Sequence, residues 1–240
     1  MVRQFTGTCG VVPALDSDSV ERIEEVVRAT SGVEGVAGYK IGLSSALRLG
    51  LAESVRRLRD LTDLPLLYDH QKAGPDMPDM AGTFARLCAE AGVDGLVLFP
   101  VAGPTAVRRF TGEARASGLI PVVGGEIPAP DYCVSGGGYL ADDALDRIIA
   151  EAAGAGADHF VLPARAPGRI ARWSGWISAR VADPVVFLTG FGPLGGAIAD
   201  AFAASAACPR RFAIVGRLVT AAADPADAVR RLYAEMQAAG

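Results

Sequence analysis

The sequence predicts an α/β protein in which residues 1–240 form a single domain, a closed (β/α)8 or TIM barrel. Short apolar runs alternate about eight times with longer amphipathic stretches rich in Ala, Arg and Glu, which is the pattern of strands followed by helices. The length supports the same fold, since barrels of this type contain about 250 residues. No Pro/Ser-rich linker divides the chain.

The expected strands and helices follow from this alternation. The strands are residues 10–15, 38–43, 65–68, 95–99, 121–124, 159–162, 185–188 and 212–215. The helices between them are expected to begin near Ser19, Ser45, Asp79, Pro104, Asp142, Pro167, Gly196 and Asp224, several with a polar cap or a proline in the first turn. Successive strands lie roughly 25 to 35 residues apart, which suits right-handed crossovers in a parallel sheet.

Composition narrows the class of partner. Half of the residues are hydrophobic and the formal net charge is -4, which disfavours a general role on nucleic acids or membrane surfaces. A local cationic pocket for a small anionic molecule remains compatible with that charge. The amino terminus has no basic segment followed by an apolar one, and no apolar run reaches membrane-spanning length, so we expect a cytoplasmic protein.

Cysteine and histidine usage gives little support for a metal site. The cysteines, Cys9, Cys88, Cys133 and Cys208, lie far apart and form no Cys-x-x-Cys pair, so we expect reduced thiols. His70 and His159 are also isolated from other residues at metal-ligand spacing. The sequence therefore predicts no metal.

Charged residues fall where a barrel places its chemistry, at the carboxyl ends of strands and in the loops that follow. They are Asp16 after the first strand, Lys40 within the second, Asp69 and Lys72 at the end of the third, Asp76 in the next loop, and Arg217 after the eighth. Lys40 would point into an apolar barrel and needs a carboxylate partner, for which Asp69 is the obvious candidate. Two alternatives stay open: Asp16 caps the first helix, or residues 69–79 form an ordinary solvated turn.

Glycine-rich loops follow the seventh and eighth predicted strands. Residues 190–196 contain a G-x-G-x-x-G string, but it lacks the acidic residue about twenty positions later that a dinucleotide-binding fold requires. In a barrel, these two loops commonly bind phosphate through backbone N–H groups. The candidate phosphate-binding residues are Gly192, Gly195, Gly196, Gly216 and Arg217. The alternative is that the glycines only make tight turns.

Together these segments resemble the orotidine 5′-monophosphate decarboxylase family over nearly the whole chain. The resemblance rests, in order, on Ala14-Leu15-Asp16, Tyr39-Lys40-Ile41-Gly42-Leu43, residues 69–78, Thr189 to Gly196, and Ile214-Val215-Gly216-Arg217. It implies a (β/α)8 barrel that decarboxylates orotidine 5′-monophosphate to UMP without a cofactor or metal. It also implies a homodimer with active sites near the subunit interface.

The resemblance assigns roles to individual positions. Lys40 and Asp69 would hold a charge network, Lys72 would protonate the carbon that loses carbon dioxide, and Asp76 would come from the neighbouring subunit. Asp16 would contact the ribose. Pro128, in Gly125-Glu126-Ile127-Pro128-Ala129-Pro130, occupies the place of a serine that contacts the pyrimidine.

This chain departs from the family pattern at three places. Its catalytic segment reads Asp-x-x-Lys-x-x-x-Asp, one residue longer on each side of the lysine, and Leu194 and Pro128 replace a glutamine and a serine of the family. One alternative is therefore a decarboxylase or aldol-type lyase acting on another phosphorylated or nucleotide-like substrate. A non-catalytic nucleotide-binding barrel is a third hypothesis. Arg165 and Arg169 form either an anion-binding lid or an exposed basic loop.

Overall fold

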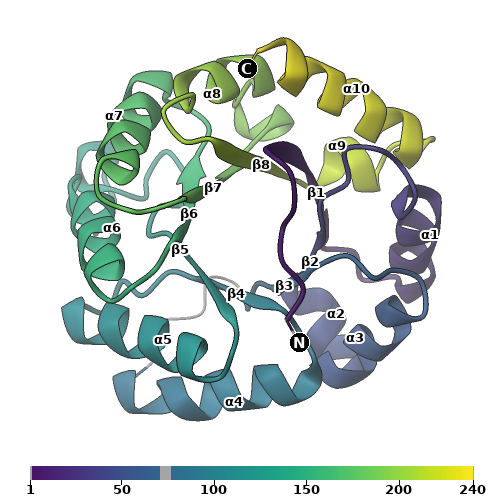
Figure 1. The fold of residues 1–240 in the computed structure, drawn as a ribbon, viewed down its shortest axis with the longest axis horizontal. Helices are drawn as coiled ribbons and strands as arrows, with labels where there is room; N and C mark the ends of the chain where they lie inside the picture. Colours follow the sequence, from purple (N-terminus) through teal and green to yellow (C-terminus); the bar gives the residue numbers. More distant parts are fainter. Residues whose placement is uncertain (1, 71–76, 240) are drawn as a thin grey trace.

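The computed structural model describes residues 2–70 and 77–239, and within them eight parallel strands close into a barrel surrounded by helices (Figure 1). The strands are β1 Cys9–Leu15, β2 Tyr39–Ile41, β3 Leu66–Tyr68, β4 Gly95–Leu98, β5 Ile120–Val123, β6 His159–Pro163, β7 Val185–Thr189 and β8 Arg210–Val215. Each strand pairs with the next, and β8 pairs in parallel with β1 to close the sheet. The predicted barrel is confirmed, and every predicted strand overlaps an observed one.

Helices follow the strands on the outside of the barrel. They are α1 Val20–Thr30, α2 Leu43–Leu49, α3 Leu51–Arg59, α4 Ala81–Ala91, α5 Pro104–Ala116, α6 Ala144–Gly154, α7 Pro167–Ser178, α8 Ile198–Ala204, α9 Arg217–Thr220 and α10 Pro225–Ala238. Short 3-10 turns occupy Pro78–Met80, Val134–Gly136 and Gly192–Leu194. Pro104 and Pro167 begin α5 and α7 as predicted, because the fixed φ of proline suits the first helical turn.

Two helical features were not predicted from the sequence. The stretch after β2 was expected to be one helix, but it divides into α2 and α3 at Gly50, whose φ of 77° is outside the helical region. The short helix α9 follows β8 directly and places Arg217 in its first turn. No described helix combines the length and the apolar character needed to cross a bilayer.

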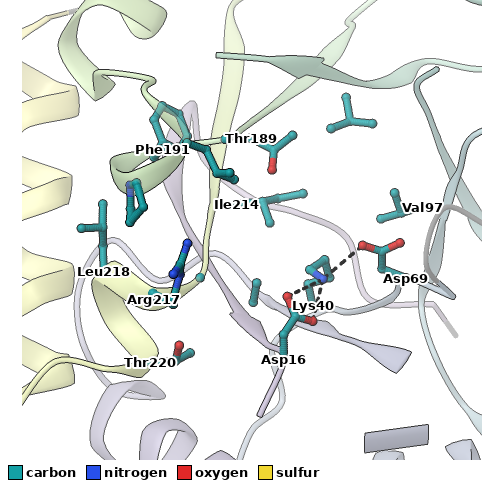
Figure 2. A pocket seen from close by; sticks show the side chains of 16 residues that line it. Asp16, Lys40, Asp69, Val97, Thr189, Phe191, Ile214, Arg217, Leu218 and Thr220 are labelled. Atoms are coloured by element: carbon teal, nitrogen blue, oxygen red, sulfur yellow. Dashed lines mark hydrogen bonds and ion pairs between the residues drawn. The ribbon is translucent and has the colours of Figure 1, made fainter. Parts of the chain in front are cut away.

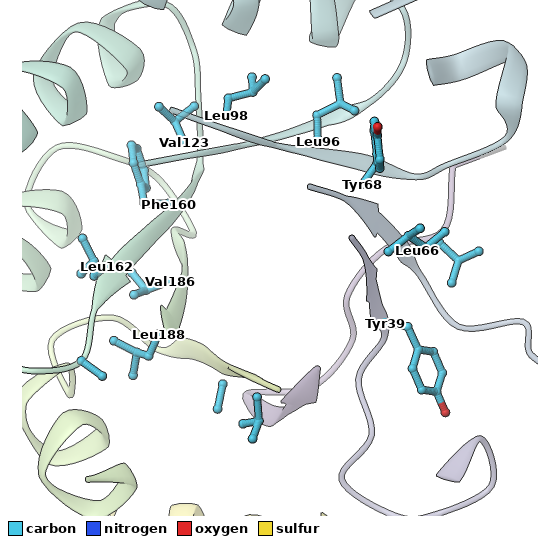
Figure 3. Packing of buried hydrophobic residues seen from close by; sticks show 14 of the residues in the cluster. Tyr39, Leu66, Tyr68, Leu96, Leu98, Val123, Phe160, Leu162, Val186 and Leu188 are labelled. Carbon is cyan, nitrogen blue, oxygen red and sulfur yellow. The ribbon is translucent and has the colours of Figure 1, made fainter. Parts of the chain in front are cut away.

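Alternating side chains divide the core into two layers. One set points outward from the strands and packs under the helices, including Leu66, Leu96 and Val186 (Figure 3). The other set, including Val12 and Leu67, fills the barrel interior. This division follows from the period-2 geometry of strands and leaves most strands apolar on both faces, as is usual for buried parallel sheets; β2 is an exception, because Lys40 lies between its outward-facing Tyr39 and Ile41.

The amino-terminal segment crosses the barrel interior before β1 begins (Figure 1). Phe5 is 1% exposed, and its ring centroid lies 4.9 Å from that of Phe187 and 5.6 Å from that of Phe212. The backbone N–H of Arg3 donates to Asp94, which also accepts from the N–H of Leu66 at the start of β3. The amino-terminal end of the barrel is therefore closed by packed side chains.

Candidate active site

Charged side chains from three neighbouring strands meet at the carboxyl end of the barrel. Strand pairing aligns Ala14 of β1 with Lys40 of β2, and Lys40 with Leu67 of β3. Ala14 and Leu67 both point into the barrel, so Asp16 and Asp69, each two residues further on, are expected on the same face. The structure brings both carboxylates to the ammonium of Lys40 (Figure 2).

The distances define a compact charge cluster. The Lys40 Nζ atom donates to Asp16 Oδ1 at 2.9 Å and Oδ2 at 3.1 Å, and to Asp69 Oδ2 at 3.1 Å. The Lys40 and Asp69 side chains are 7% and 3% exposed, whereas Asp16 is 45% exposed at the mouth of the site. We call these three residues the charged wall. Asp16 is part of this cluster, and Ser19, not Asp16, caps α1 with its side chain.

The cluster keeps Lys40 charged. Burial by itself lowers the pKa of Lys40, but the charges of Asp69 and Asp16 and their hydrogen bonds outweigh that penalty and raise the pKa above its ordinary value. Burying an ammonium is costly unless its geometry and its remaining hydrogen bonds are satisfied. Lys40 is therefore a fixed cation between two acids, placed before any ligand arrives.

Lys72 and Asp76, predicted as proton donor and second acid, lie outside the described residues, so their places stay predictions. His70 precedes them and is exposed. Its Nδ1 atom hydrogen-bonds the hydroxyl of Tyr68, and its ring centroid lies 5.9 Å from that of Phe84. His70 therefore packs toward α4.

A cavity of about 380 Å³ opens above the charged wall. It is lined by Ala14, Asp16, Lys40, Asp69, Val97, Val161, Thr189, Gly190, Phe191, Pro193, Leu194, Ile214, Gly216, Arg217, Leu218 and Thr220. Part of its surface is apolar, since Val97, Val161 and Ile214 come from strand positions that face the interior. A ligand here would meet anions and one cation on one side and the loops after β7 and β8 on the other (Figure 2).

The opposite side of the cavity is built from residues 189–194 and 216–217, which we call the loop wall. Gly190 and Gly192 have φ values of 100° and 67°, in the left-handed region that favours glycine. Arg217 is exposed, and within the described part of the chain its guanidinium makes no hydrogen bond or ion pair. The loop wall thus presents to the cavity a permanent cation that no other described residue pairs with.

Several predicted contact residues lie beside the cavity and not on its surface. Among the described residues, Gly192, Gly195 and Gly196 are absent from the lining, although Gly190, Gly216 and Arg217 belong to it. The amide of Gly196 instead donates to the carbonyl of Gly190 at 3.0 Å, which closes the loop on itself.

Pro128 belongs to an adjacent cavity of about 270 Å³, which it shares with Arg165 and Arg169. Arg165 Nη1 donates to the Pro128 carbonyl at 3.0 Å, and Arg169 forms paired bonds of 2.8 and 2.6 Å with the Glu126 carboxylate. A Cβ atom on Gly190 would lie 3.1 Å from Pro128 Cβ, so the two loops touch. Both arginines are tied to the segment after β5. The expected alternatives, an anion-binding lid or an exposed basic loop, stay predictions.

Thr189 and Thr220 line the cavity but were not among the predicted site residues, although Thr189 begins the predicted phosphate loop. Strand parity could have found Thr189, because Val185 and Phe187 point into the barrel and Thr189 continues that face at the end of β7. A second missed signal is composition: Lys40 and Lys72 are the only lysines in the sequence, and every other basic side chain apart from histidine is arginine. An ammonium can give up a proton in a suitable environment, whereas a guanidinium cannot.

Within residues 2–70 and 77–239, no group of three or more His, Cys, Asp or Glu side chains is placed to hold a metal ion. Cys9, Cys88, Cys133 and Cys208 are free thiols. Burial raises the pKa of Cys88 to about 12 and that of Cys208 to about 11, so both stay protonated near neutral pH.

Comparison with known proteins gives a consistent result. Residues 10–232 match the model of the orotidine 5′-phosphate decarboxylase / HUMPS family. The orotidine 5′-phosphate decarboxylase of Pyrococcus abyssi is 28% identical over 228 residues, covering 95% of this chain and 99% of the relative. That of Methanosarcina barkeri is 28% identical over 233 residues and covers 95% of both chains.

Solved structures agree on the fold. The orotidine 5′-monophosphate decarboxylase of Methanocaldococcus jannaschii, complexed with the inhibitor BMP, has a TM-score of 0.80 at 20% identity, covering 96% of this chain and 99% of that one. The enzyme from Pyrococcus horikoshii has a TM-score of 0.74 at 23% identity, covering 95% and 99%.

Proposed function

Because the chain belongs to the orotidine 5′-phosphate decarboxylase / HUMPS family, we propose that it decarboxylates orotidine 5′-monophosphate to UMP without a cofactor. The relatives from Pyrococcus abyssi and Methanosarcina barkeri both carry the name of that decarboxylase, which supports the predicted enzyme class, a carbon–carbon lyase. The observation that carries the proposal is the Asp16–Lys40–Asp69 cluster, which faces Arg217 across one cavity; among the described residues, the Arg217 guanidinium has no hydrogen-bond or ion-pair partner.

The chemistry needs a fixed positive charge at the reacting carbon. Loss of carbon dioxide from the substrate's ring leaves a vinyl-type carbanion that cannot easily delocalise its charge. In our proposal Lys72 stabilises that carbanion and then protonates it, while Asp69 and Lys40 hold the surrounding charges in place. Retaining lysine at only two positions supports this role, since arginine could not deliver the proton.

The loop wall supplies binding energy away from the reacting carbon. Arg217 binds the 5′-phosphate together with backbone N–H groups of the two loops, and Asp16 contacts the ribose. Energy gained at a remote phosphate can be used to orient and distort the reacting end of a substrate. This assigns the two ends of the nucleotide to the two walls.

The complete site requires two subunits in this proposal. Asp76 of the partner subunit enters the cluster next to Lys72, which makes the active enzyme a homodimer working in the cytoplasm. A dimer measured by analytical ultracentrifugation at assay concentrations supports this assignment. Full activity in a strictly monomeric form contradicts it.

The direct test of the activity follows the orotate absorbance of orotidine 5′-monophosphate after the protein is added. We expect the absorbance to fall with release of one carbon dioxide per UMP formed. Lys72→Ala should abolish turnover while UMP still binds. No absorbance change with protein equimolar to substrate would contradict the proposed reaction.

A second candidate function is favoured by Pro128 and Leu194. Proline has no N–H and no hydroxyl, and leucine has no polar side-chain atom, so neither side chain can hydrogen-bond a pyrimidine. The candidate is a decarboxylase or aldol-type lyase acting on another phosphorylated or nucleotide-like substrate. Turnover of a phosphorylated sugar acid that exceeds turnover of orotidine 5′-monophosphate would favour it.

The non-catalytic hypothesis makes a different prediction. It requires no turnover of any phosphorylated acid and no loss of ligand affinity in Lys72→Ala. Under this hypothesis, the desolvation free energy of the buried Lys40–Asp69 pair would serve no catalytic function.

A further inference from the structure

Gly42 follows β2 directly and has φ −92° and ψ 175°, an extended conformation that any residue adopts. The backbone therefore does not require glycine here. Its position is unusual for another reason, because it lies beside the carboxylate of Asp16.

A side chain at position 42 would collide with that carboxylate. A Cβ atom built on Gly42 lies 1.9 Å from Asp16 Oδ1, 3.0 Å from its Cγ and 3.5 Å from its Cα. These are the three nearest atoms outside the neighbouring residues, and all three belong to Asp16. The space that a methyl group would fill is thus occupied by one functional carboxylate.

That carboxylate oxygen is the one that accepts from Lys40 Nζ at 2.9 Å. Because the Asp16 side chain is 45% exposed, it is free to rotate toward solvent when displaced. Rotation would take it away from Lys40 and leave the buried ammonium without one of its two carboxylate partners in the charged wall.

We propose that Gly42 is a positioning residue of the active site: its missing side chain makes room for the Asp16 carboxylate beside Lys40. Gly216, across the cavity, offers the contrast. Gly216 lines the cavity, and a Cβ atom there meets nothing within 4 Å. A methyl group would therefore collide with a functional carboxylate at Gly42 but with no protein atom at Gly216.

The catalytic consequence rests on the proposed decarboxylation. Misplacing a catalytic group by about 1 Å can cost on the order of 10²-fold in rate. Gly42→Ala is therefore expected to lower kcat/KM for orotidine 5′-monophosphate by about 10- to 100-fold. The structural consequence does not depend on any substrate, since Gly42→Ala should also lower the denaturation midpoint by separating Asp16 from Lys40.

The test is a double-mutant cycle of the wild type, Gly42→Ala, Asp16→Ala and the double variant. Both the urea denaturation midpoint and kcat/KM are measured. We expect Gly42→Ala to lower both quantities in the wild-type background. In the Asp16→Ala background, where the clash is gone, Gly42→Ala should leave the midpoint nearly unchanged and alter kcat/KM by less than about 2-fold. Equal effects of Gly42→Ala in both backgrounds would overturn the inference.

A control variant and a folding comparison make the outcome unambiguous. Gly112→Ala, in α5, introduces a methyl group that meets nothing within 4 Å and is expected to leave both readouts unchanged or slightly improved. If Gly42→Ala fails to fold while the double variant folds, the coupling to Asp16 is supported.

The cycle also separates this inference from the proposed function. Non-additive midpoints in a protein that does not turn over orotidine 5′-monophosphate would support the positioning role and refute the decarboxylase. Turnover of orotidine 5′-monophosphate combined with additive midpoints and additive kcat/KM would support the decarboxylase and refute the positioning role.

Discussion

The charged wall and the loop wall face the same cavity but differ in how their cations are paired. In the charged wall, Lys40 is buried and hydrogen-bonded to both acids. In the loop wall, the guanidinium of Arg217 has no hydrogen-bond or ion-pair partner among the described residues. The charged wall is assembled by folding, whereas in our proposal the loop wall is completed by the phosphate of the bound nucleotide. Substitutions should therefore affect stability on one side and ligand binding on the other.

The largest expected effect is on the charged wall. Lys40→Met leaves two carboxylates without their cation, and breaking a buried pair by removing one partner costs about 3–5 kcal/mol of unfolding free energy. Chemical denaturation measures the loss. A variant as stable as the wild type would show that the charged wall is not assembled by folding.

The second effect is on the loop wall. Arg217→Ala should leave the denaturation midpoint unchanged but weaken UMP binding by about 10- to 100-fold, because hydrogen bonds to charged groups contribute about 1.5–3 kcal/mol. Isothermal titration calorimetry with UMP measures the change. Arg86→Ala, on the exposed surface of α4, is the control and should alter neither quantity. A lower midpoint in Arg217→Ala would remove the distinction between the walls.

Of the two walls, only the charged wall should lose its contribution to folding stability at alkaline pH. A lysine whose pKa is raised by folding contributes stability that is complete below the unfolded value of about 10.4 and is lost as pH rises through the folded value. The difference in unfolding free energy between wild type and Lys40→Met should therefore stay constant to about pH 10 and narrow above it. A difference that narrows between pH 6 and 9 would contradict the raised pKa.

Tyrosines and thiols titrate in both proteins and cancel from that difference. Burial raises the pKa of Tyr39 and of Tyr68 to about 12, so each lowers stability once the unfolded side chain ionises near pH 10. NMR titration of protein labelled with ¹⁵N-lysine checks the raised pKa of Lys40 directly. The chain has only two lysines, and Lys72→Ala assigns their signals.

The smallest predicted effect concerns Thr189 in the loop wall. Thr189→Val keeps the shape of the side chain but removes its hydroxyl, and a neutral hydrogen bond contributes about 0.5–1.5 kcal/mol. We expect UMP affinity to fall by about 2- to 10-fold in Thr189→Val and to be retained in Thr189→Ser. Equal affinity of Thr189→Val and wild type would show that the hydroxyl does not contact the nucleotide.

Much of this arrangement could be predicted from the sequence because it follows from strand periodicity. The alternation of apolar runs and amphipathic stretches predicted the barrel, and the rule that chemistry lies at strand ends selected Asp16, Lys40, Asp69 and Arg217. These residues are placed by regular structure, which short-range patterns encode. Lys72 and Asp76 remain predictions.

The sequence could not supply contacts that depend on loops meeting in space. Arg169 and Glu126 are far apart in the chain and pair only because the segment after β5 folds against α7. The close fit of Gly42 to Asp16 likewise depends on the distance between the ends of β1 and β2. Periodicity predicts the direction of a side chain but not the space around it, so such contacts could not be predicted from the sequence.

The most direct test of the comparison is a crystal structure of the protein with UMP bound. We predict that Lys40 Nζ keeps its contacts to Asp16 and Asp69 at the present 2.9 and 3.1 Å, while Arg217 moves to bind the phosphate. A complex in which Lys40 leaves its acids, or in which the phosphate lies away from Arg217, would contradict the account.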